Sequence, residues 1–152
     1  MNVKRLVREQ VDEQLAKLKS NAAPLPQKGW IRTVRRALGM SARQLGDRIG
    51  MTQQAVASLE KSEAQGKISL ATLRRVAEAM DCVVVYAIVP NTTLDDTLRR
   101  QARKVAANRV ARVSHSMTLE DQALDREKAE RAIERHTQEL IDRLPPTLWN
   151  RQ

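Results

Sequence analysis

The sequence predicts a mainly α-helical protein with one β-strand, and three observations support this fold class. Residues 41–60 contain two short helical patterns joined by a tight turn. Apolar residues recur at spacings of three and four over most of the remaining chain, which is typical of amphipathic helices. Residues 82–89 are uncharged and rich in β-branched side chains, which favours a strand that ends at Pro90.

The two helical patterns of residues 41–60 carry clear start and stop signals. Ser41 and Thr52 are good N-caps for the first and second helix. Gly50 follows the first helix, where a chain leaving a helix often needs a positive φ. Gly46 lies inside that helix at a cost of about 1 kcal/mol relative to alanine. We therefore expect another helix to pass close to its backbone.

Val56 and Leu59, three residues apart, set the buried side of the second helix. The spacing Leu45-Gly46, Ile49-Gly50, Val56, Leu59 resembles the helix-turn-helix of the Cro and phage-repressor type. The resemblance covers roughly residues 29 to 80. It implies that the second helix enters the major groove of duplex DNA by its N-terminal residues.

This resemblance assigns roles to individual side chains. Gln53, Gln54 and Ser58 face away from the buried side and are the expected base contacts, since glutamine can pair bidentately with adenine. Arg35 and Glu60 occupy the places of a buried ion pair. Such domains often hold a phosphate with a glutamine where this chain has Ala42, which shifts attention to Arg43. The expected phosphate contacts are Ser41, Arg43, Thr52, Lys61 and Lys67, the last two in an expected loop over residues 61–67.

A longer resemblance is to the family called mobile mystery protein A, whose members are typically encoded beside a Fic-domain protein. It runs over residues 29–32, 81–90 and 119–124. It implies an alternative function, an antitoxin that neutralises a neighbouring Fic-domain protein. Residues 116–121 match the inhibitory pattern Ser/Thr-x-x-x-Glu-Gly/Asn at Ser116 and Glu120 but not at the last position, and a helix beginning at residue 118 explains the same residues.

The charge of the chain favours a nucleic-acid partner. Lysine and arginine number 27 against 18 acidic residues, a net charge of +9, and such a surplus suits a polyanion better than an acidic small substrate. The aromatic residues, 2% of the chain, are too few for the stacking platforms of single-strand binders. We expect double-stranded DNA, in the form of a palindromic operator, and a dimeric autorepressor.

Four segments are expected: an amphipathic helix and linker over 1–28, a DNA-binding domain over 29–81, a strand over 82–90 and a helical extension over 91–152. A lone strand leaves its N–H and C=O groups without partners, so we expect it to pair with the same strand of a second copy across a two-fold axis. The first helix either packs on its own domain or forms a dimer arm. The basic run over 99–112 is either a solvated face or a surface for phosphates or an acidic partner.

Several other classes of function are disfavoured. His115 and His136 have no metal-ligand spacing, no phosphate-binding glycine loop is present, and the single Cys82 begins an apolar run. We expect no enzyme activity, no cofactor and no metal. No stretch approaches the roughly 18 apolar residues of a membrane span. A cytoplasmic protein, associated with the nucleoid when bound to DNA, is therefore expected.

Overall fold

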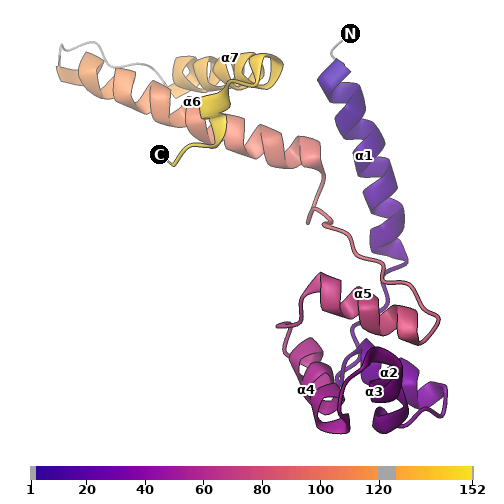
Figure 1. The fold of residues 1–152 in the computed structure, drawn as a ribbon. Helices are drawn as coiled ribbons and strands as arrows, with labels where there is room; N and C mark the ends of the chain where they lie inside the picture. Colours follow the sequence, from indigo (N-terminus) through magenta and orange to yellow (C-terminus); the bar gives the residue numbers. More distant parts are fainter. Residues whose placement is uncertain (1–2, 120–125, 152) are drawn as a thin grey trace. The chain divides into compact units, whose positions relative to one another are not determined.

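The computed structural model describes residues 3–119 and 126–151, which divide into two compact units. One unit comprises Asn21–Ala87, and the other combines Met1–Ser20 with Ile88–Gln152. The described elements, drawn in Figure 1, are α1 (Val3–Ser20), α2 (Trp30–Ala37), α3 (Ala42–Ile49), α4 (Gln53–Ala64), α5 (Leu70–Ala79), α6 (Leu94–Leu119), α7 (Arg126–Arg143) and the 3-10 helix η1 (Pro146–Trp149). No helix among these residues has the length and apolar content needed to span a membrane.

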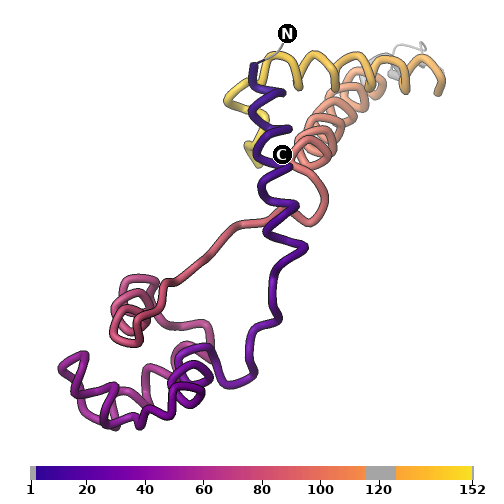
Figure 2. Tube along the Cα trace, turned by 90° about the vertical axis from the view of Figure 1, so that its right-hand side faces the viewer, coloured from indigo at the N-terminus to yellow at the C-terminus, as the bar shows by residue number. Residues whose placement is uncertain are grey.

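The unit of residues 21–87 packs helices α2 to α5 around one apolar core. Each helix contributes to it, and the most deeply buried members are Ile31, Leu45, Val56, Val76 and Met80. Leu38, the C-cap residue of α2, is 56% exposed and does not belong to this core. The four helices can be followed in the tube of Figure 2.

The turn between α3 and α4 is fixed by its own hydrogen bonds. Gly50 adopts a left-handed conformation with φ of 69°, and the N–H of Met51 donates to the carbonyl of Gly46 at 2.8 Å. A Cβ atom on Gly46 would lie 2.4 Å from the carbonyl oxygen of Met51. Glycine is therefore required because the chain folds back onto the helix at this turn. The expected neighbouring helix is not the cause.

The helical unit, as we call residues 1–20 and 88–152, has a separate core. Side chains of α6, α7 and η1 form it: Leu98, Ala102, Val105, Ala106, Leu140, Ile141 and Leu148. Two of the basic residues on α6 pair with acids on α7. Arg99 Nη1 lies 3.0 Å from Glu134 Oε1, and Arg103 pairs with both Glu130 and Glu134. This part of the basic run is thus neutralised within the unit, while Lys104 and Arg109 are exposed.

Three expectations about local structure were wrong. Residues 82–90 form no strand within the single chain, because its described residues contain no second strand to bond with them. The expected loop over 61–67 is half helical, since α4 continues to Ala64 and includes Lys61. The last helix does not begin near residue 118, which lies within α6; α7 begins at Arg126.

The turn geometry predicts that Gly46→Ala destabilises the unit of residues 21–87. Moving the Met51 carbonyl away from the new methyl group should cost about 1–3 kcal/mol of unfolding free energy, as overpacking does elsewhere. Chemical denaturation of the full chain measures this cost. Asp47→Ala, at the exposed next position of the same helix, should change stability by less than about 0.5 kcal/mol. Equal effects of the two substitutions would contradict the close approach.

Candidate nucleic-acid interface

Helix α4 presents an exposed polar face and buries an apolar one. Val56 is 1% exposed, and Leu59 packs against the same core. Gln53, Gln54 and Ser58, the expected base contacts, are exposed, and so is Ala57 between them. These residues lie on the first two turns of α4 and are free to enter a groove. Whether they contact bases stays a prediction.

The N-terminal turns of α3 and α4 can each bind an anion. Ser41 Oγ accepts a hydrogen bond from Gln44 N–H at 3.1 Å, and Gln44 Oε1 accepts one from Ser41 N–H at 2.8 Å. Thr52 Oγ1 accepts from Ala55 N–H at 3.2 Å. Because each hydroxyl acts as an acceptor here, its own O–H hydrogen can still be donated to a phosphate oxygen. The unpaired N–H groups and positive end of each helix favour the same ligand.

The expected basic phosphate contacts lie on α3, on α4 and in the segment after α4. Arg43 is exposed on the first turn of α3, and Lys61 is exposed on the last part of α4. Lys67 is exposed in the segment between α4 and α5. The structure describes no ion pair for any of the three, so their charges are not neutralised by a neighbouring carboxylate. Their contact with phosphate stays a prediction.

Helix α4 is held against α2 by two buried carboxylates. Arg35 Nε donates to Glu60 Oε1 at 2.6 Å, and the two side chains are only 12% and 9% exposed, so the expected ion pair is present. Arg35 Nη1 also donates to the carbonyl of Met40 at 2.7 Å. The Arg35 guanidinium therefore joins α4, α2 and the chain that enters α3.

The second carboxylate, Glu63, was missed in the sequence because residues 61–67 have no apolar pattern. Its two oxygens accept hydrogen bonds from the N–H groups of Trp30 and Ile31, each at 2.8 Å. Gly29, the N-cap of α2, offers no side-chain bond, and a Cβ there would lie 2.6 Å from Glu63 Oε2. Glu63 thus replaces the missing cap of α2.

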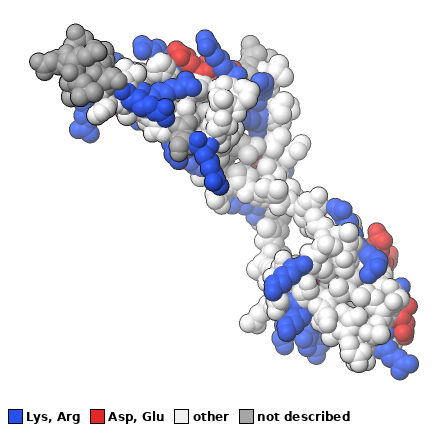
Figure 3. Space-filling view, turned by 60° about the vertical axis from the view of Figure 1, so that its left-hand side comes forward, with Lys and Arg blue, Asp and Glu red and all other residues white. Residues whose placement is uncertain are grey.

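These two pairings also shape the surface charge. Residues 21–87 carry ten basic and five acidic side chains. Glu60 and Glu63, two of the five acids, are buried and bonded inward. Basic side chains outnumber acidic ones on the face of this unit seen in Figure 3. No group of three or more His, Cys, Asp or Glu side chains in the described ranges could hold a metal ion.

A family model described as a helix-turn-helix matches residues 31–83. The match begins within α2 and ends just after α5, so it coincides with the four-helix core described above. Residues 31–83 are therefore a helix-turn-helix domain, the class found in DNA-binding transcription regulators. Curated proteins and solved structures gave no match to the chain. The family match gives no evidence for the resemblance to the mobile mystery protein A family.

The cap formed by Glu63 predicts that Glu63→Gln destabilises this domain. The amide would turn an NH₂ group toward one of the two backbone N–H donors, leaving that buried donor unsatisfied at a cost of about 1–3 kcal/mol. Thermal and chemical unfolding measure the loss. Glu78→Gln makes the same chemical change at an exposed position of α5 and serves as the control. If both variants unfold like the wild type, Glu63 is not a structural cap.

Proposed function

We propose that this protein is a sequence-specific regulator of transcription that binds duplex DNA through α4. The observation that carries the proposal is the exposed face of α4, with Gln53, Gln54 and Ser58 on a helix whose other face is locked into the core. The family match over residues 31–83 supports the same class of function. Two glutamines at the start of the helix suit recognition of adenine in the major groove.

Contacts with the phosphates of the DNA backbone supply the remaining affinity. The candidate groups are the hydroxyls of Ser41 and Thr52, which cap α3 and α4, and the exposed charges of Arg43, Lys61 and Lys67. Phosphate contacts of this kind position a protein on DNA without reading its sequence, and each one makes the affinity more sensitive to salt. In the proposed interface, Gln53, Gln54 and Ser58 on α4 contact bases, and the other candidate residues contact phosphates.

We further propose that the regulator acts as a symmetric dimer on a palindromic site near its own promoter, as a repressor. Support comes from residues 83–88, where Val83, Val85, Tyr86 and Ile88 are 84%, 77%, 61% and 89% exposed. The N–H and C=O groups of residues 83–89 make no hydrogen bond to other described residues. Residues 82–90 carry no charge, so two copies can align without repulsion. Antiparallel pairing would satisfy the N–H and C=O groups on the facing edge of each copy and bring apolar side chains of the two copies together.

The antitoxin alternative, binding to a neighbouring Fic-domain protein, rests on the longer sequence resemblance. Its candidate element begins at Ser116, whose backbone belongs to α6, and its key residue Glu120 lies outside the described residues. DNA binding would then serve autoregulation. We place the DNA-binding role first because it is supported by the described surface of α4.

Base reading by α4 predicts that Gln53→Ala costs about 1–3 kcal/mol on the cognate site and little on random DNA. Lys61→Ala is the comparison, because loss of a phosphate contact should weaken binding to all sequences alike and reduce the salt slope by about one. Fluorescence anisotropy at several salt concentrations measures both. Equal losses on cognate and random DNA for Gln53→Ala would rule out base reading at this position.

Antiparallel pairing of two copies through residues 83–88 predicts that a proline in this segment yields a monomer. Successive N–H groups point to opposite edges of a strand, so one of Val84→Pro and Val85→Pro must remove a hydrogen bond of the pair. Neither should change the helical signal, since residues 82–90 lie outside the helices. Sedimentation at tens of micromolar decides between the states. If both proline variants remain dimeric, or if the wild type is a monomer, the two copies do not pair through residues 83–88.

A further inference from the structure

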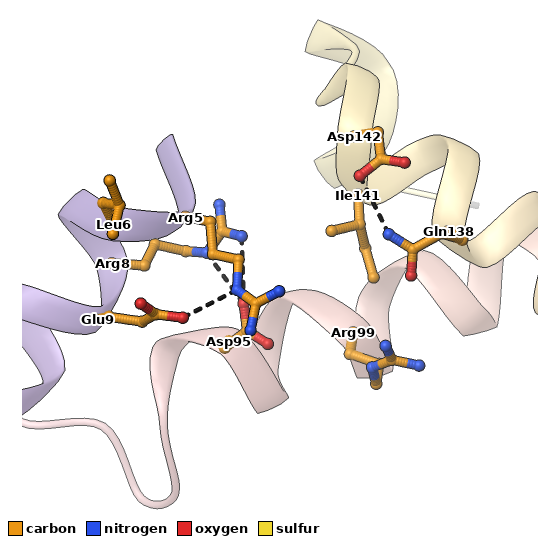
Figure 4. A pocket seen from close by; sticks show the side chains of 9 residues that line it. All are labelled: Arg5, Leu6, Arg8, Glu9, Asp95, Arg99, Gln138, Ile141 and Asp142. Atoms are coloured by element: carbon orange, nitrogen blue, oxygen red, sulfur yellow. Dashed lines mark hydrogen bonds and ion pairs between the residues drawn. The ribbon is translucent and has the colours of Figure 1, made fainter. Parts of the chain in front are cut away.

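Helix α1 makes several polar contacts with the start of α6. None of its residues is buried. The carboxylate of Asp12 accepts a hydrogen bond from the N–H of Leu94 at 2.8 Å. Arg8 Nη2 lies 3.1 Å from Asp95 Oδ1, a pair drawn in Figure 4. These contacts place a negative charge of α1 at the positive end of α6 and a positive charge of α1 beside the acidic first turn of α6.

A third contact lies where the chain leaves α1. Lys19 Nζ donates to the carbonyl of Asn91 at 2.9 Å, one residue before the end of the helix at Ser20. Within the helical unit, the point of departure of the chain toward residues 21–87 therefore lies beside the point of its return. Both linkers, residues 21–28 and 82–90, are anchored at one place as long as α1 stays on α6.

The contacts that hold α1 on α6 can be broken at a low cost in free energy. The Arg8 and Asp95 side chains are 15% and 47% exposed, so solvent reaches one partner of this ion pair and lowers its contribution to stability. Val11 and Leu15 on α1 are half-buried, whereas Val3 and Val7 are 71% and 51% exposed and no residue of α1 is fully buried, so apolar burial supports the polar contacts only in part. The groove of about 440 Å³ between α1, α6 and α7 is lined by charges that already pair with one another, Arg5 with Glu9 and Arg8 with Asp95 (Figure 4).

We propose that α1 is a releasable clasp that controls how freely the helix-turn-helix domain moves. With the clasp closed, the domain is tethered to the helical unit at both ends. With α1 released, only residues 82–90 tether it, and the domain gains orientations. On a dimer, the closed clasp restricts the spacing of DNA half-sites that two domains can occupy together. This consequence rests on the proposed DNA-binding function, whereas the clasp itself does not.

The test compares two double variants of the full chain that have the same change in charge. Arg8→Ala with Asp12→Ala removes both the donor to Asp95 and the acceptor of the Leu94 N–H. Arg5→Ala with Glu13→Ala also removes one positive and one negative charge from α1 but leaves those contacts intact. Hydrogen exchange of the α1 amides, measured without DNA, should be about tenfold faster in the clasp variant and within about twofold of the wild type in the control. Equal exchange in the two variants overturns the clasp.

A second measurement tests whether the clasp restricts the half-site spacing that the protein accepts. The wild type and the control should lose about tenfold in affinity when the half-site spacing of the operator is altered by two base pairs, and the clasp variant should lose less than about threefold. Faster α1 exchange with an unchanged spacing preference overturns the regulatory role. Because the exchange experiment contains no DNA, a wild type that fails to bind any specific site would overturn the proposed function alone.

Discussion

The carboxylates of Glu60 and Glu63 fix α4 against α2, and the exposed face of the helix-turn-helix domain depends on this attachment. Glu60 neutralises the nearly buried Arg35, and Glu63 supplies the cap that α2 lacks. Removing one partner of such a buried pairing leaves the other desolvated without compensation, which is more costly than the net gain from the pair. The two residues thus set the direction in which Gln53 and Gln54 project from the domain.

The same two carboxylates link stability to electrostatics. A glutamate on the outer face of α4 would oppose DNA phosphates, whereas Glu60 and Glu63 lie on its inner face and bond to α2. The domain therefore keeps its acidic anchors without exposing their charge. In the helical unit, by contrast, basic side chains are neutralised, since Arg99 and Arg103 on α6 are paired with acids on α7. Helix α6 consequently offers a weaker polyanion surface than its sequence indicated.

Local signals in the sequence predicted the turn of the helix-turn-helix domain well. Ser41, Gly50 and Thr52 act within three or four residues of themselves, and each has the expected role in the structure. The capping of α2 by Glu63 could not be read in the same way, because its partners Trp30 and Ile31 lie more than thirty residues away. A signal existed in hindsight: α2 begins after Gly29, which has no side chain to cap it.

Longer-range organisation was the least predictable part. The apolar run over 82–89 has the composition of a strand, but a strand also needs a partner backbone, which the described part of the chain does not provide. The helical unit joins α1 to α6 through contacts between residues more than seventy positions apart, such as Asp12 and Leu94. Helical periodicity identifies each of these helices but does not indicate which of them pack together.

The central claim is that α4 reads duplex DNA, and selection from a random duplex library tests it most directly. The full chain would be equilibrated with the library at moderate salt, and the bound fraction would be sequenced over several rounds. Base contacts by α4 in a symmetric dimer predict enrichment of two adenine-containing half-sites related by two-fold symmetry, with centres about one helical turn, roughly 34 Å, apart. Bound sequences that remain as random as the input would contradict it.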